Sequence, residues 1–228
     1  MSTRPSRIPI RIWDLPTRLF HWLLVLLVTG MFVTATLGGL WMDWHVRLGQ
    51  AMCGLLLFRL LWGVFGGRWS RFSSLRLQLS ALMQQLSGQS PASMEAGHSP
   101  SGSWSVVIML LALLTQTITG LFSSDDIAFA GPLAGWVSSD SSRWFTRIHL
   151  WGQNLILALL ALHILAVLFQ SLVRRKTLMA PMLTGDKPLP ADTPASRDTP
   201  ASWLLALLLL CLCVAFAWWL GTLSSPLL

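Results

Sequence analysis

The sequence predicts an all-α integral membrane protein, with a bundle of four transmembrane helices and a fifth transmembrane helix near the C-terminus. The 228 residues are 54% hydrophobic and only 11% charged, whereas about a quarter of a soluble domain is charged. Five apolar runs are long enough to cross a hydrocarbon layer roughly 30 Å thick. The net charge is +7, but the basic residues lie at the ends of these runs, which disfavours nucleic-acid binding.

The apolar runs place the helices in order along the chain. We expect them at 19–37, 46–65, 103–122, 145–173 and 202–220. The fourth is long enough to tilt or to project beyond the bilayer. The predicted organisation is a cytoplasmic segment (1–18), a four-helix core (19–173), a cytoplasmic proline-rich linker (174–201), and a fifth helix with an outer tail (202–228).

The connecting segments differ in composition. Residues 1–18 are polar and contain proline, and no small-residue cleavage site follows, so we expect no cleaved signal peptide. Leucines between Leu75 and Leu86 recur at helical spacing and predict a short helix lying in the membrane interface. Residues 88–103 are rich in Ser, Gly and Pro and are expected to be mobile. Five prolines between Pro181 and Pro200 predict a flexible linker.

The distribution of basic residues predicts the orientation of the helices. Thirteen of the 16 Lys and Arg residues fall on the side of the N-terminus and three on the other side. Basic residues favour the cytoplasmic side, so we expect a cytoplasmic N-terminus and a periplasmic C-terminus in a bacterial inner membrane. Tryptophans near both ends of the runs form two aromatic belts, which supports this orientation.

Four histidines lie near the ends of the predicted helices. His149 and His163 are 14 residues apart in one run, which in an α-helix is about 21 Å of rise and about 40° of rotation. With the predicted topology, His21 is level with His163 near the inner side, and His45 is level with His149 near the outer side. Ionisable residues inside a membrane mark functional sites by default.

Two level pairs of imidazoles predict two haem groups, each held between two helices with both axial positions filled. His21 and His163 form one ligand pair, and His45 and His149 form the other. Zinc and copper sites gather three or four ligands at one place. A non-redox metal transporter or a proton relay therefore remains the less favoured interpretation.

The remaining histidine and the three cysteines are expected to be unrelated to this site. His98 falls in the segment predicted to be mobile and is expected to be solvated. Cys53, Cys211 and Cys213 lie within apolar runs outside any C-x-x-C-H motif, and are expected to be small buried apolar residues.

Several residues near the histidines are candidates for contact with a haem. Arg59 follows His45 by 14 residues, and its guanidinium could hold a propionate or extend to the membrane surface. Gly49 and Gly152 lie one turn from His45 and His149, where they could admit a flat ring or serve helix packing. Weaker propionate candidates are Arg18 and Arg147.

A cluster of polar residues near the outer end of the third helix is a candidate site for proton exchange with a ligand. It comprises Thr115, Gln116, Thr117 and Thr119, followed by Asp125 and Asp126. Carboxylates there could relay protons. The alternatives are a solvated acidic turn or, together with Asp140, a surface that docks a basic partner.

Several motifs together resemble the bacterial cytochrome b561 family, which is related to the b-type cytochrome subunits of nickel–iron hydrogenases. They are Trp13-Asp-Leu-Pro-Thr-Arg-Leu-Phe-His21-Trp22, His45-Val-Arg-Leu-Gly49, Phe58-Arg59-Leu-Leu-Trp62-Gly63, the run from Ile148 to His163, and Thr119-Gly-Leu-Phe-Ser-Ser-Asp-Asp126. The resemblance covers roughly residues 10–187. It implies a four-helix core with two b haems, ligated by the residues that match His21, His45, His149 and His163.

The resemblance also implies electron transfer between the quinone pool and a redox partner at the periplasmic face. Ubiquinone is the expected quinone, with the polar cluster near the outer end of the third helix as its candidate site, and a c-type cytochrome is one possible partner. Because both axial positions are filled, O₂ binding at iron is disfavoured. The alternative function is a self-sufficient quinone-coupled oxidoreductase, for example one that couples superoxide to quinone.

Overall fold

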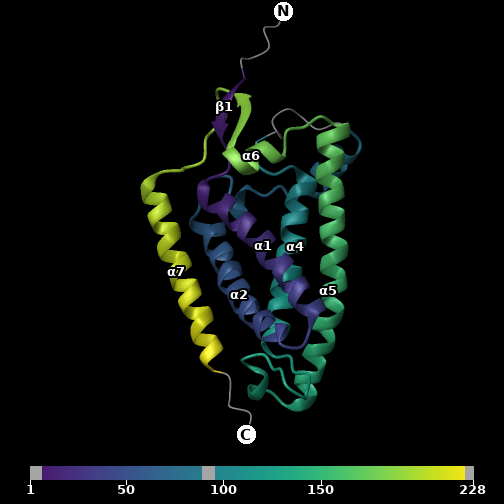
Figure 1. Cartoon of the computed structure of the whole chain (residues 1–228). Coiled ribbons are helices and arrows are strands. Elements are labelled where there is room, and N and C mark those ends of the chain that lie inside the picture. The colour runs from purple at the N-terminus through teal and green to yellow at the C-terminus, as the bar shows by residue number, and fades with distance from the viewer. Residues whose placement is uncertain (1–6, 89–95, 224–228) are drawn as a thin grey trace, which may run out of the picture. The chain divides into compact units, whose positions relative to one another are not determined.

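Five long helices dominate the structure, a computed structural model that describes residues 7–88 and 96–223 (Figure 1). They are α1 (Leu15–Leu37), α2 (Trp41–Phe65), α4 (Pro100–Leu121), α5 (Ser139–Leu168) and α7 (Pro200–Thr222). The last turn of α5 continues as a π-helix, Phe169–Val173. All five helices are long and apolar enough to cross a membrane, which confirms the predicted all-α membrane fold.

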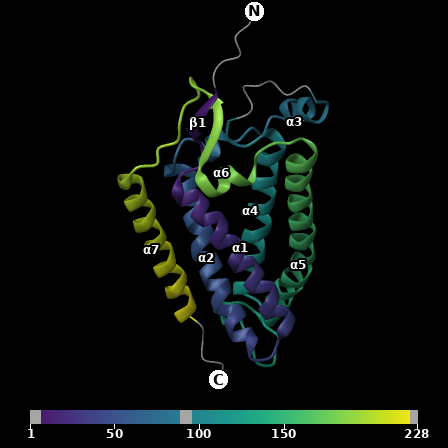
Figure 2. The same ribbon diagram turned by 45° about the horizontal axis from the view of Figure 1, so that its top comes forward.

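Short elements connect the long helices. Two 3₁₀ turns, Phe72–Ser74 and Ala134–Trp136, precede α3 and α5. The short helix predicted between the second and third long helices is confirmed as α3 (Leu79–Leu86), which is labelled in Figure 2. Of the segment predicted to be mobile, residues 89–95 lie outside the described residues, and Pro100 already begins α4.

The prediction of a flexible linker before the fifth helix is wrong for residues 181–190. Met179–Thr184 forms the short helix α6, and Asp186–Pro190 forms the strand β2. β2 pairs antiparallel with β1 (Arg7–Arg11), with Ile8 opposite Leu189 and Pro9 opposite Pro188. Proline is tolerated because each strand of a two-stranded ribbon has a free edge.

The chain forms two compact units. Unit 1 comprises residues 1–19, 59–108 and 162–207, and unit 2 comprises residues 20–58, 109–161 and 208–228.

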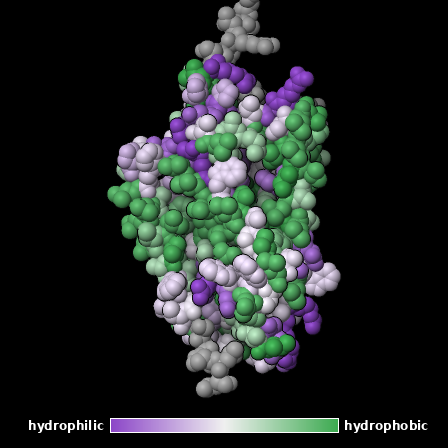
Figure 3. Space-filling view, viewed as in Figure 1, coloured by the Kyte–Doolittle hydropathy of each residue, from purple (hydrophilic) through white to green (hydrophobic). Residues whose placement is uncertain are grey.

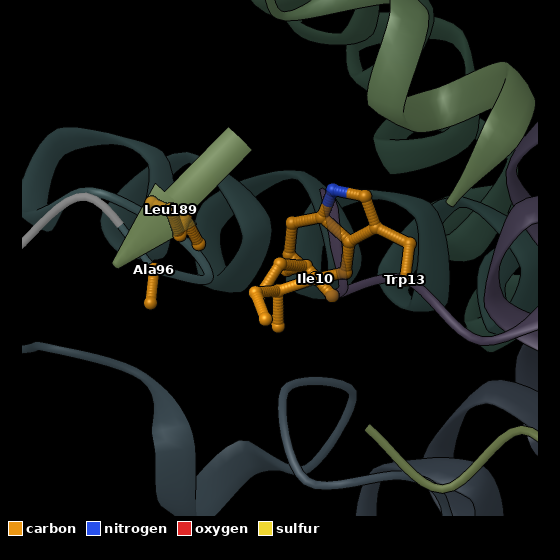
Figure 4. Close-up of a cluster of buried hydrophobic side chains, with 5 residues drawn as sticks. Ile10, Trp13, Ala96 and Leu189 are labelled. Carbon is orange, nitrogen blue, oxygen red and sulfur yellow. The ribbon is translucent and has the colours of Figure 1, made fainter. Parts of the chain in front are cut away.

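The core of unit 1 lies beside the β1–β2 ribbon. Ile10, Ile12, Trp13, Ala96 and Leu189 are buried together there, as Figure 4 illustrates for the labelled side chains. Trp69 and Met182 pack against this cluster. Burying two or three large apolar side chains contributes several kcal/mol, at about 1.5–3 kcal/mol each. The ribbon is therefore anchored by its side chains as well as by its hydrogen bonds.

A fully buried carboxylate, Asp14, organises the rest of unit 1. Its Oδ1 accepts hydrogen bonds from Thr17 N (2.9 Å) and Trp62 Nε1 (3.2 Å). Its Oδ2 accepts from Gly67 N (2.9 Å) and Ser70 Oγ (2.8 Å). Asp14 thus caps the N-terminus of α1 and joins it to the end of α2 and the loop that follows.

A second carboxylate of unit 1, Asp198, connects the start of α7 to the start of α1. Its Oδ1 accepts hydrogen bonds from Leu15 N (3.0 Å) and Trp203 Nε1 (2.5 Å). Its Oδ2 accepts from Arg11 Nη1 at 2.9 Å. The segment before the fifth helix is therefore held by specific contacts.

The core of unit 2 draws on four helices. Val28 comes from α1, Met52 and Leu56 from α2, Leu113 from α4 and Ile156 from α5. The fifth helix approaches α2 closely at Gly54, where an added Cβ would lie 3.2 Å from Cys213 O and 3.3 Å from Val214 Cα. A four-helix core with α7 packed on α2 results.

The three cysteines are buried to different degrees. Cys213 is buried, Cys53 is half-buried, and Cys211 is exposed on α7. The expectation of burial is therefore wrong for Cys211, because on a helix two residues of spacing turn the side chain to another face.

Large apolar side chains cover the outward faces of α5 and α7, as the green surface in Figure 3 shows. Leu162 and Leu165 on α5 and Leu204 and Leu208 on α7 are all more than half exposed. Extended apolar surface of this kind is unfavourable in water and favourable against lipid. The chain is therefore a multi-pass membrane protein.

Candidate functional site

The structure brings His45 and His149 together in unit 2. His45 lies in the second turn of α2, and His149 lies in the first half of α5. Their ring centroids are 6.2 Å apart, and the ring planes are nearly perpendicular, at 89°. Both side chains are half-buried. Two helices that are far apart in sequence thus present their imidazoles to each other, at the outer level of the sequence-based prediction.

Each of these two rings is oriented by a backbone carbonyl of a neighbouring helix. Nδ1 of His45 lies 3.1 Å from Met31 O on α1, and Nδ1 of His149 lies 2.9 Å from Gln116 O on α4. Because a carbonyl oxygen can only accept, Nδ1 must be the protonated nitrogen in both rings. In the neutral ring, the lone pair that can ligate a metal is then on Nε2.

The separation of the two rings fits a metal bound between them. An iron ligated by one nitrogen of each ring requires centroids about 6 Å apart, since a metal–imidazole bond is about 2 Å long and the nitrogen lies about 1 Å from the ring centre. The observed 6.2 Å agrees with this requirement. Within residues 7–88 and 96–223, no three His, Cys, Asp or Glu side chains are grouped to hold a metal ion. Two imidazoles from separate helices would suit a haem iron as ligands.

The family model of prokaryotic cytochrome b561 matches residues 12–185, well over half of the chain. The chain belongs to the prokaryotic cytochrome b561 family. This makes it a transmembrane b-type cytochrome of electron transfer, and membership implies that it binds b-type haem. α7 lies beyond the matched residues. No curated protein and no solved structure matches the chain.

A glycine that the sequence reasoning did not single out makes room for His149 in this cytochrome. An added Cβ at Gly120, in the last turn of α4, would lie 2.8 Å from His149 Cε1 and 3.2 Å from Nδ1. Contacts this short would displace the ring. The sequence signal was available, because Gly120 follows Thr119 in one of the family motifs.

The two predicted glycines have different roles. An added Cβ at Gly152 would overlap the Gln116 side-chain oxygen, so Gly152 admits that amide. Gln116 Nε2 in turn donates to His149 O at 2.9 Å. At Gly49, the nearest atom to an added Cβ is Met31 Cε at 3.7 Å, an ordinary contact distance, so the packing does not require a glycine there.

A threonine hydroxyl group lies close to the Nδ1 atom of each of the two histidine rings, His45 and His149. Thr34 is 5% exposed, and its Oγ1 lies 3.2 Å from His45 Nδ1. Thr119 Oγ1 lies 3.5 Å from His149 Nδ1 and donates to Thr115 O at 2.8 Å. Gln116 and Thr119, predicted as part of a quinone site, therefore contact His149.

The acidic turn after α4 has a structural role. Asp125 Oδ1 accepts hydrogen bonds from the backbone N–H groups of Ile127, Ala128 and Phe129, at 2.9–3.0 Å. The bonds from Phe129, Ile127 and Ala128 lower the pKa of this exposed carboxyl. A carboxylate that stays ionised while capping a turn is poorly suited to relaying protons. The geometry therefore favours the alternative of a solvated acidic turn at Asp125.

The inner pair of histidines is distributed over the two units. His21, on α1 in unit 2, is half-buried, and its ring lies edge-on to Trp22 at 5.2 Å. His163, on α5 in unit 1, is also half-buried. The pairing of His21 with His163 stays a prediction.

The predicted propionate-binding arginines have protein partners or lie at the surface. Arg59 is 5% exposed, donates from Nη1 to Ser70 O at 3.2 Å, and lies 4.9 Å over the ring of Phe72. Arg18 Nη1 donates to Leu183 O, and Arg147 is exposed. The burial of Arg59 favours a structural role in unit 1 over extension to the membrane surface.

The prediction that His98 is solvated is wrong. Its ring packs against Trp13 with centroids 4.5 Å apart, its Nδ1 is buried, and its backbone oxygen accepts from Arg76 Nη1 at 3.3 Å. Burial, followed by the charges of Arg59 and Arg76, lowers the pKa of His98 to about 3. The ring is therefore neutral and structural. Asp14 was likewise missed, although an Asp three residues before Thr17 is a typical helix cap.

Proposed function

We propose that this cytochrome carries two b haems, each held by two histidines, and transfers electrons between the quinone pool and a redox partner at the periplasmic face. Its proposed location is the bacterial inner membrane, with the N-terminus cytoplasmic. The observation that carries the proposal is the His45–His149 pair, with ring centroids 6.2 Å apart and both Nδ1 atoms on backbone carbonyls.

In this proposal His45 and His149 hold the outer haem through Nε2. When bound, the haem supplies an iron that accepts and returns one electron at a time. Met31 O and Gln116 O hold the protonated Nδ1 of each ring, which fixes its orientation and raises the basicity of the ligating nitrogen. Gly120 leaves the space that the ring of His149 occupies.

The inner haem is assigned to His21 and His163. Support comes from α5, which contains both His149 and His163 in one uninterrupted α-helix, Ser139–Leu168. It comes also from the helical spacing of these two residues and from the position of His21 at the inner end of the first apolar run. Two haems at different depths would allow electrons to cross the bilayer in two short steps.

Haem quantification in variants tests this proposal. The wild-type protein is expected to bind two haems per chain, with the sharp α band of bis-imidazole haem b in the reduced spectrum. His45→Ala and His149→Ala are each expected to retain one haem, and so is the double variant, because both residues ligate the same iron. His98→Gln is the matched control, since His98 packs on Trp13 outside the ligand set, and it should retain two.

The double variant distinguishes the pairing from its alternatives. Loss of both haems from it, with one retained in each single variant, would show that His45 and His149 serve different irons. A purified, inserted wild-type protein without any haem spectrum would refute the function itself.

A further inference from the structure

Unit 2 contains an open cleft of about 910 Å³ beside the first turns of α2. One wall is α2 itself, with Arg47 and Gln50, and a second is the connection from α4 to α5, with Asp126 and Phe129. The third wall belongs to α7, through Val214 and Trp218. The volume is within the range of ligand-binding pockets, about 300–1,000 Å³. Because α7 lies beyond residues 12–185, the part of the chain that matches the family does not build this cleft alone.

The α2 wall of the cleft is polar, whereas the α7 wall is apolar. Arg47 and Gln50 provide hydrogen-bond donors on α2, whereas the α7 wall is apolar and belongs to a helix with exposed leucines. The charged residues of the lining are Asp43, Arg47 and Asp126. Two carboxylates against one guanidinium disfavour an anionic ligand such as a lipid phosphate or superoxide. The cleft therefore suits a neutral molecule with polar acceptors at one end and an apolar body.

We propose that this cleft binds the headgroup of a membrane quinone, with its isoprenoid tail along α7. The proposal rests on the proposed function, in which quinone exchanges electrons with the cytochrome. A quinone ring is neutral, and its carbonyl oxygens need donors, which Arg47 and Gln50 supply. Its tail enters from lipid, to which α7 is exposed. Arg47 lies two residues after His45 in α2, so its side chain is on another face of the helix and α2 itself lies between the cleft and the proposed haem ligand.

The internal contacts of the cleft keep its donors in place. The guanidinium of Arg47 lies 5.4 Å over the ring of Trp44. An added Cβ at Gly221, at the end of α7, would lie 2.5–3.0 Å from the Gln50 amide atoms. The close approach of α7 at Gly221 therefore holds the amide of Gln50 against the third wall.

Photolabelling with an azido-ubiquinone analogue tests the site in the full-length, haem-loaded protein. We expect the label in the peptides that contain residues 43–51, 124–142 or 214–218, and we expect unlabelled quinone to compete. Val214→Trp should lower this labelling by about tenfold, because the indole fills the cleft. The matched control Leu212→Trp places the same side chain on an exposed position of α7 outside the lining and should label as wild type.

Steady-state reduction by quinol supplies a second readout. Arg47→Gln should raise the quinol concentration for half-maximal haem reduction by about tenfold, since it removes a donor to the bound ring. Arg143→Gln, a change at an exposed arginine outside the lining, should leave it unchanged. If Val214→Trp fails to retain haem, Ala51→Phe fills the cleft from the α2 wall instead.

The results of these experiments distinguish an error in the proposed quinone site from an error in the proposed function. Label elsewhere in the chain, or equal labelling of the Val214→Trp and Leu212→Trp proteins, would overturn the proposed site while the function stands. Labelling in the cleft of a wild-type protein whose haem is neither reduced by quinol nor oxidised by quinone would support the site and refute the proposed function. Co-purified phospholipid in the cleft that quinone does not displace would also overturn the proposal.

Discussion

A single methyl group at Gly120 should weaken the binding of one haem. In Gly120→Ala the new Cβ would lie 2.8 Å from His149 Cε1, about 0.6 Å inside the 3.4 Å at which ordinary contact begins. The ring has to rotate away, which costs about 0.5–1.5 kcal/mol for an off-rotamer side chain. Its hydrogen bond to Gln116 O, now 2.9 Å, weakens at a cost of similar size. The total of about 1–3 kcal/mol corresponds to haem binding weakened about 5- to 150-fold.

Transfer of haem to an excess of an apo-globin measures this change. The purified cytochrome is mixed with the acceptor, and the loss of the reduced α band is followed over time. The expected result is one fast and one slow phase in Gly120→Ala, because only one of the two haems is affected. Gly30→Ala is the control, since it adds the same methyl group to α1 where the nearest atom is the flexible end of Leu48, 3.1 Å away.

Identical transfer kinetics in the two glycine variants would refute the reasoning that Gly120 makes room for a haem-binding ring. Acceleration of both phases would instead show that the substitution loosens the whole bundle. The Gly30→Ala protein is also a control for the gain in helix propensity that any Gly→Ala change brings.

Two further predictions concern unit 1. Asp14→Ala leaves four buried donors without their acceptor and should lower the free energy of unfolding by about 3–5 kcal/mol, with a smaller loss in Asp14→Asn. Thermal denaturation in detergent checks this, with the exposed Asp140→Ala as the control, expected to change stability by less than about 0.5 kcal/mol. His98 has a pKa of about 3 in the folded chain, against an ordinary value of 6.5. Between these two pH values the unfolded chain binds a proton at His98 that the folded chain does not bind. The free energy of unfolding therefore falls as the pH drops below 6.5. Wild type should therefore lose more melting temperature between pH 7 and pH 5 than His98→Gln, and equal losses would contradict the burial of this ring.

Close packing could not be predicted from composition or periodicity. The space that Gly120 leaves for His149, and the contact of α7 with α2 at Gly54, depend on which residues of separate helices meet. The ribbon of β1 and β2 pairs residues more than 170 positions apart, and its prolines indicated a linker because propensity takes no account of a distant partner strand. Burial of Asp14 and of the Nδ1 atom of His98 depends on the same long-range contacts.

The sequence by itself determined the five membrane helices, because bilayer thickness imposes a length and a hydrophobicity that can be counted along the chain. It also determined the family, through motifs that include the four histidines. Only the tertiary structure decided that Met31 O and Gln116 O hold Nδ1 of His45 and His149, and that α7 forms one wall of a cleft beside α2. The physical reason is that a helix forms from local hydrogen bonds and transfer free energy, whereas the orientation of a side chain depends on atoms that other helices bring within a few ångströms.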